Sequence, residues 1–283
     1  MFMLVLANLQ TYEQNSSMID PISRYLHRSA GEHGPVMLMY HSVTADSRSA
    51  NWPWAVSLQG FRSQLDFLAE QGWSTPTMAE LVATPEKWAG RTAVITFDDG
   101  YVDNLIAWEE LQKRAMRATW FVVSGSIGRD PSWPADGRPT GRLLSATELR
   151  AMQASGMEIG SHTANHVRLT EADDTLLTTE LLDSKAALEH AVGEEILSFA
   201  YPYGAWDARC ANAVREAGYR AACTTRTGWA LRDGDPFLLR RLTVFNKDTV
   251  ASLARKLYFG ANDVSWQAVS RYGLQRVAAR MRA

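Results

Sequence analysis

The chain has 283 residues, of which 46% are hydrophobic and 21% are charged, and its formal net charge at pH 7 is −2. These values are ordinary for a soluble globular protein with a substantial core, in one barrel-sized α/β domain or two smaller domains. The near-neutral charge gives no electrostatic case for binding nucleic acid or an anionic membrane surface. Cys210 and Cys223 do not form a C-x-x-C pair, so we expect free buried thiols, with a disulfide as the alternative.

The start of the chain differs in pattern from the remainder. Residues 1–33 are expected to form an irregular or helical extension ahead of one domain, residues 34–283, that ends in two helices. Residues 1–9 are apolar, but no basic residue precedes them and no clear small-residue cleavage site follows. They match a signal peptide poorly and are too short to span a bilayer. We therefore expect no transmembrane segment, and cytoplasmic residence is favoured.

Strand and helix signals alternate along the domain. Apolar, β-branched runs predict strands, and amphipathic runs that open at capping residues predict helices. The expected strands are 36–40, 93–97, 118–123, 157–160, 197–200, 219–224 and 239–245, and helices are expected to begin near 57, 77, 103, 145, 172 and 207. This alternation predicts parallel β-α units with right-handed crossovers, in a barrel or a doubly wound sheet.

The apolar run 93–97 ends in Asp98, Asp99 and Gly100. Successive side chains of a strand point to opposite faces, so two adjacent aspartates would not ordinarily share a site. At a strand end followed by glycine this alternation relaxes, and both carboxylates can reach one pocket. The alternative is an Asp-Gly turn that carries two solvated acids.

Residues with useful chemistry follow several of the expected strands directly. They are His41, Asp98, Asp99, His162, His166 and Tyr203. Because ligands gather at the C-terminal ends of parallel strands, we expect these side chains to converge. A His-x-x-x-His pair with one carboxylate can bind zinc and leave a coordination position open to water, as a catalytic site requires. The alternative is two histidines that only form hydrogen bonds within a loop.

Two of these segments resemble motifs of a known family. Residues 96–100 (TFDDG) and 161–166 (SHTANH) resemble the polysaccharide deacetylases with a NodB-homology domain, carbohydrate esterase family 4. The resemblance extends over about residues 35–244. It implies a deformed (β/α) barrel of about seven parallel strands and a divalent metal, usually zinc.

The resemblance also implies a role for each matching residue. The implied metal ligands are Asp99, His162 and His166. Asp98 is the implied catalytic base, and Thr163 would support the loop of the second motif. The family's third motif matches residues 200–204, which implies that the Tyr203 backbone N–H helps to stabilise the tetrahedral oxyanion.

The chain departs from the family pattern at two points. Ala200 stands where the family has an arginine that orients the base, and no histidine follows His190 to act as the late general acid. Arg241, with Arg240 as its rival, could pair with the base, and His41 could be the acid unless it is a core or capping histidine. This rearranged order resembles the branch that contains the poly-β-1,6-N-acetylglucosamine deacetylases of biofilm matrices.

The implied reaction removes acetyl groups from an N-acetylated glycan. A metal-bound water would attack the amide carbon, with Asp98 as base, and His41 would protonate the departing amine. An O-deacetylase, a deacetylase of small N-acetyl compounds and a catalytically degenerate glycan-binding protein remain as alternatives. A glycosidase fits less well, because adjacent aspartates are too close to flank a glycosidic bond at about 5–9 Å.

Aromatic residues near these loops are candidates for a platform on which sugar rings pack. They are Trp52, Trp54, Trp133, Trp206 and Trp229, and each could instead be a core residue. Biofilm deacetylases generally work outside the cytoplasm, so export to the periplasm is the alternative to cytoplasmic residence.

Overall fold

The computed structural model describes residues 19–45, 52–133, 138–139 and 141–272. The apolar stretch 1–9, on which the expected location depends, lies outside the described residues. Among the described residues, none of the helices combines the length and the apolar character that a membrane span needs.

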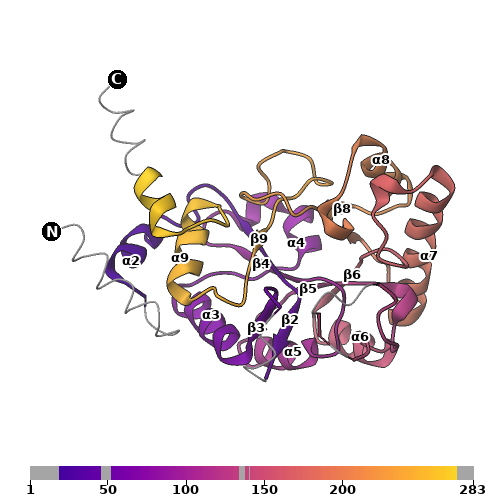
Figure 1. The fold of residues 1–283 in the computed structure, drawn as a ribbon, viewed down its shortest axis with the longest axis horizontal. Coiled ribbons are helices and arrows are strands. Elements are labelled where there is room, and N and C mark those ends of the chain that lie inside the picture. The colour runs from indigo at the N-terminus through magenta and orange to yellow at the C-terminus, as the bar shows by residue number, and fades with distance from the viewer. Residues whose placement is uncertain (1–18, 46–51, 134–137, 140, 273–283) are drawn as a thin grey trace.

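One seven-stranded parallel sheet forms the centre of the fold, in the order β8-β7-β6-β5-β4-β1-β9 (Figure 1). Its strands are β1 (Val36–Tyr40), β4 (Ala93–Phe97), β5 (Thr119–Val122), β6 (Glu158–Ser161), β7 (Ser198–Ala200), β8 (Ala221–Cys223) and β9 (Leu242–Thr243). Leu239 bridges to Cys223 of β8, and three residues later the same chain pairs with β1 as β9. The sheet therefore curls into an incompletely closed barrel, which confirms the predicted deformed (β/α) barrel.

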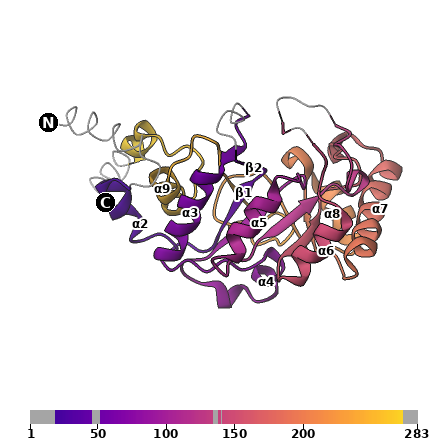
Figure 2. The ribbon, with the colours of Figure 1, turned by 90° about the horizontal axis from the view of Figure 1, so that it is seen from below.

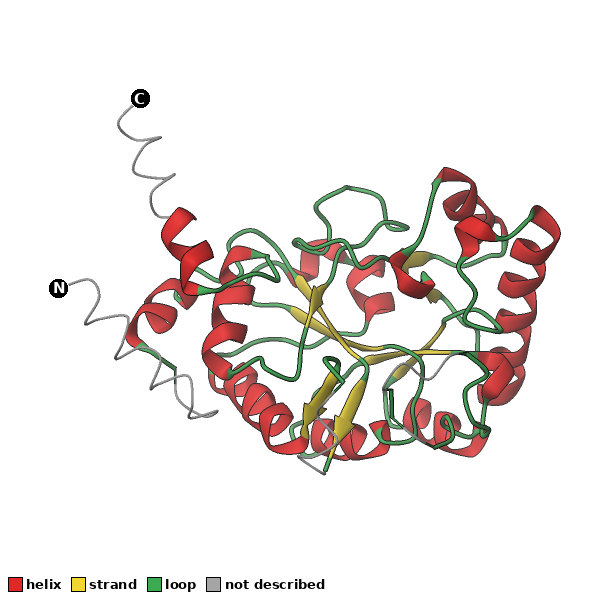
Figure 3. Cartoon of the chain, in the orientation of Figure 1, coloured by secondary structure: helices red, strands yellow, loops and turns green. Residues whose placement is uncertain are grey.

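Helices surround the sheet, as Figure 3 shows. They are α2 (Pro21–His27), α3 (Leu58–Glu70), α4 (Met78–Ala83), α5 (Asn104–Gln112), α6 (Ala146–Ala154), α7 (Asp174–Val192), α8 (Ala208–Glu216) and α9 (Val250–Phe259). Several begin where the sequence predicts, at a side-chain cap: Ser57 accepts the Gly60 N–H, and Ser145 forms a capping box with Glu148. A cap of this kind satisfies one of the backbone donors that the first helical turn leaves unpaired.

The register of the central strands sets the level of the site residues. Every residue of β1 and β4 is buried, as expected for parallel strands covered on both faces. Tyr40 pairs with Phe97, and the Asp98 N–H donates to the Tyr40 carbonyl at 3.0 Å. His41 and Asp98 therefore leave neighbouring strands at the same height.

Two features differ from the sequence-based expectation. A small parallel pair, β2 (Ser42–Thr44) with β3 (Ala55–Ser57), was not predicted, since its strands are short and pair across a long loop. The expected strand 239–245 is reduced to β9, because the chain there passes from pairing with β8 to pairing with β1. Cys210 and Cys223 are both free and buried. This confirms the expected free thiols, and the two residues form no disulfide.

The described part of the N-terminal extension packs onto the domain. Helix α2 lies beside α9 in both views of the ribbon (Figure 2). The buried Asp20 carboxylate caps α2 through the Ser23 N–H at 2.9 Å, and Arg255 of α9 donates to Ser23 Oγ at 2.9 Å. Polar contacts that are buried and satisfied in this way fix the orientation of α2 on α9.

Candidate active site

The backbone leaves regular strand geometry directly after β4. The Gly100 N–H donates to the Asp98 carbonyl at 2.9 Å, across Asp99, whose φ is +73°. A three-residue turn with a positive central φ is rare and strained. It ends the alternation of the strand, so Asp98 and Asp99 line the same cavity.

Backbone strain is concentrated in the loops around this cavity. Among the described residues, five other than glycine have a positive φ, and four of them belong to these loops. They are Asp99, Thr163, His166 and Tyr203, and the fifth is Ala115. Thr163 Oγ1 accepts the His166 N–H at 2.9 Å, and this bond holds the second motif in its shape. Strain of this kind persists only where the surrounding structure enforces it, and it clusters at functional sites.

Asp99, His162 and His166 form a buried group that could hold a metal ion. Asp99 Oδ1 lies 3.6 Å from His162 Nε2 and 3.3 Å from His166 Nε2. Ligands at about 2.0–2.1 Å from a tetrahedral zinc ion would be separated by about 3.3–3.4 Å, so these spacings fit. Asp99 Oδ1 is also buried and accepts no hydrogen bond from the described residues. A buried carboxylate oxygen without a donor is consistent with a cation as its partner.

Electrostatics favours the ligand forms of these side chains. Burial lowers the pKa of His162 to about 4, which keeps its ring neutral, the form that binds metals. Burial acts to raise the pKa of Asp99, but the nearby His166 imidazole outweighs burial and lowers that pKa. His162 is thus neutral and Asp99 is ionised, which are the forms that bind a cation.

The second carboxylate, Asp98, is held by Arg241. Arg241 is fully buried and donates from Nη1 and Nη2 to Asp98 Oδ1 and Oδ2 at 2.6 and 2.8 Å. Its Nε donates to the Thr224 carbonyl at 3.0 Å, which fixes the plane of the guanidinium. Burial acts to raise the pKa of Asp98, but the Arg241 charge lowers it below its ordinary value.

Arg240, the rival candidate, makes the same kind of contact elsewhere. It donates to both carboxylate oxygens of Asp233 at 2.8 Å, at a more exposed position. Consecutive residues of extended chain point to opposite sides, so only one of the two arginines can face the barrel interior. That residue is Arg241.

His41 also lines the cavity, with its ring edge-on to Trp52 at a centroid distance of 5.7 Å. Its Nδ1 is buried and has no hydrogen-bond partner among the described residues. The backbone of His41 is held from α5, because Asn104 Nδ2 donates to the His41 carbonyl at 2.8 Å and to Asp103 Oδ1 at 2.9 Å. Asp103 accepts the Ser42 hydroxyl in turn, and burial raises the pKa of Asp103 to about 6.

The cavity has a volume of about 510 Å³. Three of the five tryptophan candidates line it: Trp52, Trp54 and Trp133. Trp206 instead packs against the core, with the Arg226 guanidinium 5.7 Å from its ring centroid. Trp229 lies against His33, at a centroid distance of 4.7 Å. Fewer tryptophans therefore line the cavity than the sequence predicts.

Several lining residues were not identified from the sequence. They are Met39, Tyr101, Arg138, Thr225, Thr243 and Phe245. Tyr101 directly follows the first motif, so adjacency alone could have indicated it. Burial and the nearby Asp99 charge raise the pKa of Tyr101, so it stays a neutral phenol. Phe245 follows β9, where only the three-dimensional pairing indicates its position.

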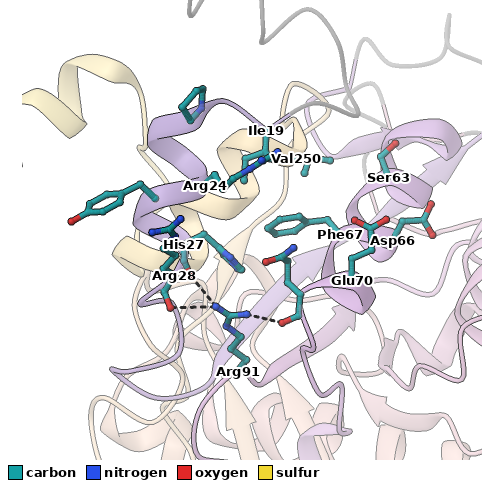
Figure 4. Close-up of a pocket in the computed structure, with 13 residues that line it drawn as sticks. Ile19, Arg24, His27, Arg28, Ser63, Asp66, Phe67, Glu70, Arg91 and Val250 are labelled. Atoms are coloured by element: carbon teal, nitrogen blue, oxygen red, sulfur yellow. Dashed lines mark hydrogen bonds between the residues drawn. The ribbon is translucent and has the colours of Figure 1, made fainter.

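A larger cavity, of about 1050 Å³, lies elsewhere, between α2 and α3 (Figure 4). Its polar groups are used to hold these elements together: Arg91 donates to the carbonyls of Gln71 at 2.8 Å and Arg28 at 3.2 Å. His27 accepts the Trp73 indole N–H at 3.0 Å, and burial lowers its pKa to about 4. None of the metal-ligating groups found in the described residues lines this cavity. We therefore place the chemistry in the smaller cavity.

Comparison with known proteins identifies the family. YxkH of Bacillus subtilis (strain 168), whose name assigns it to the polysaccharide deacetylases, is 30% identical over 212 residues, which cover 74% of this chain and 70% of YxkH. The chain belongs to the polysaccharide deacetylase family. The family model for polysaccharide deacetylases matches residues 86–222 of this deacetylase. Both sequence motifs fall inside that match, whereas His41 and Arg241 fall outside it.

Two further similarities agree with this assignment. The peptidoglycan-N-acetylglucosamine deacetylase of Bacillus cereus is 26% identical over 163 residues, 56% of this deacetylase and 63% of that enzyme. The structure of IcaB from Ammonifex degensii matches with a TM-score of 0.68 and 28% identity, covering 80% of this chain and 97% of IcaB. The recognised family, the barrel and the hydrolase class are thus confirmed.

Proposed function

We propose that this deacetylase removes acetyl groups from N-acetylglucosamine units of a glycan, with a divalent cation, zinc, held by Asp99, His162 and His166. The observation that carries the proposal is the pair of carboxylates in different settings. Asp98 is paired with a buried arginine, and Asp99 faces two histidine nitrogens. The name of the Bacillus cereus relative, which specifies N-acetylglucosamine, supports the substrate class.

A cation held at that site supplies a Lewis acid and lowers the pKa of a water molecule. Asp98 accepts the proton of the attacking water. A carboxylate offers about four lone-pair positions, and Arg241 occupies one on each oxygen, so acceptor capacity remains. The low pKa of Asp98 keeps it ionised and ready to accept.

His41 protonates the departing sugar amine. It enters from β1, the strand next to the one that carries Asp98, so base and acid reach the scissile amide from different loops. Separate positions allow the two groups to hold opposite protonation states, which hydrolysis of an amide requires. The Tyr203 backbone N–H would donate to the oxyanion.

Trp52 and Trp54 form one wall of the cavity, with ring centroids 5.3 Å apart. Flat aromatic faces pack well against the apolar faces of pyranose rings. Their closeness to His41, at 5.7 and 6.0 Å between ring centroids, would bring a sugar amine within reach of the acid.

Acetate release from N-acetylglucosamine oligomers tests the function. We expect the purified protein to release acetate, to lose this activity after treatment with a chelator, and to regain it when zinc is restored. Zinc bound without any acetate release would refute the substrate class. Release that survives complete removal of metal would refute the cation's role.

Asn104→Ala tests the support of the proposed acid. Loss of the amide removes the donor to the His41 carbonyl and one of the two donors to Asp103. We expect kcat to fall by about 10–100-fold through misplacement of the acid. Zinc affinity should be unchanged, because no metal ligand is touched. Asn212→Ala, an exposed change on α8, is the control. An unchanged kcat for Asn104→Ala would contradict the role of the amide.

A further inference from the structure

The two histidines of the candidate metal site are supported in different ways. His162 Nδ1 lies 2.8 Å from the Ala200 carbonyl, at the end of β7. His166 Nδ1 lies 3.1 Å from the Tyr203 hydroxyl. A carbonyl can only accept, so it forces the proton onto His162 Nδ1 and leaves Nε2 free to bind a metal. A hydroxyl can accept or donate, so it permits this tautomer of His166 without enforcing it.

We propose that the Tyr203 hydroxyl is a positioning group for His166, which orients its ring and holds the proton on Nδ1 so that Nε2 faces the cation. This inference rests on the metal site of the proposed function. It adds a role for the side chain of Tyr203, separate from the role of its backbone N–H. Partners of this kind tune the affinity of a metal site, and their loss typically costs about 10–100-fold.

The Tyr203 ring is held although it is half exposed. On one side it meets the His166 ring, with centroids 4.6 Å apart and the planes inclined by 60°. The Arg168 guanidinium lies 4.6 Å from the same ring centroid. An arginine over a tyrosine ring attracts it electrostatically. His166 and Arg168 belong to the same loop. That loop therefore contacts the Tyr203 ring twice, while the Tyr203 hydroxyl contacts His166 of the loop.

The backbone around Tyr203 is equally constrained. Tyr203 has a φ of +59°, and Gly204 follows with a φ of +65°. A Cβ on Gly204 would lie 1.9 Å from Thr225 Oγ1, so only glycine allows this close approach. The turn Pro202–Gly204 thus packs closely against Thr225. This packing keeps Tyr203 in the left-handed conformation beside His166.

Tyr203→Phe is the direct test, because it removes the hydroxyl and keeps the ring and the backbone N–H. Zinc affinity of the purified full chain is measured by competition with a chromophoric chelator. We expect Tyr203→Phe to bind zinc about 10–100-fold more weakly. Tyr25→Phe, on the exposed face of α2, is the matched control and should bind like the wild type.

Two further readouts separate positioning from a general structural role. Excess zinc should restore the kcat of Tyr203→Phe, since the hydroxyl acts through occupancy of the site. The visible spectrum of the cobalt-loaded protein should change in Tyr203→Phe and not in Tyr25→Phe. Zinc affinity and cobalt spectrum equal to wild type would overturn the proposal. A wild-type protein that binds no zinc would overturn the metal site as well, so the two failures are distinguishable.

Discussion

Arg241→Met is expected to lower the free energy of unfolding by about 3–5 kcal/mol, because it leaves the buried Asp98 carboxylate without its partner. Asp98 is 3% exposed and Arg241 is fully buried, so water at the cavity surface cannot replace both contacts of the guanidinium. The measurement is urea unfolding of the metal-free protein, which excludes compensation by a cation. Activity should also fall, since nothing then fixes the orientation of Asp98.

The chain carries its own control at the preceding residue. Arg240 also makes a two-point contact with an aspartate, Asp233, but closer to solvent. Asp233 would keep Arg226 as a partner after Arg240→Met. We expect this change to cost about 1 kcal/mol or less. If both substitutions lowered the free energy of unfolding equally, burial of the Asp98–Arg241 pair would not increase the cost of removing its arginine.

A double variant tests the same point. If the cost of Arg241→Met comes from an unpaired charge, adding Asp98→Asn should recover a large part of the lost stability. Two contacting residues should therefore show clear non-additivity. If the losses of stability from Arg241→Met and Asp98→Asn simply added, the cost of Arg241→Met would come from lost packing around the guanidinium and not from an unpaired charge.

Asp98→Asn is expected to reduce kcat by about 10²–10⁴-fold, the range for loss of a positioned general base. Asparagine has the size of aspartate but cannot accept the proton. Zinc affinity should stay close to that of the wild type, because Asp99 and not Asp98 faces the two histidine Nε2 atoms. The measurements are steady-state acetate release and zinc titration of the same preparation.

The less buried pair, Arg240 with Asp233, again supplies the control. Asp233→Asn should leave both kcat and zinc affinity unchanged, since Asp233 lies outside the lining of the cavity. Retention of kcat by Asp98→Asn would remove Asp98 from the reaction and leave it as a structural partner of Arg241. Loss of zinc together with kcat would instead indicate that Asp98 belongs to the metal site.

The sequence alone determined the features that depend on neighbours along the chain. Strands such as 36–40 and 93–97 were predictable because a short, continuous apolar run bounded by turn residues is typical of a fully buried strand. Caps such as Ser145 were predictable because the bonding residues lie three positions apart. The grouping of Asp99, His162 and His166 was predictable as well, since each lies in a segment that follows a strand and parallel strands end at one edge of the sheet.

Only the tertiary structure decided which distant residues complete the site. Arg241 and Asp98 are separated by 143 positions, and the choice between Arg240 and Arg241 depends on which of them faces the barrel interior. Of the tryptophans, only three reach the cavity, and the contact of the Tyr203 hydroxyl with His166 has no local signal. The physical reason is common to all of them. Local patterns encode which element forms, whereas contacts between elements depend on the order and curl of the sheet, which the whole chain sets together.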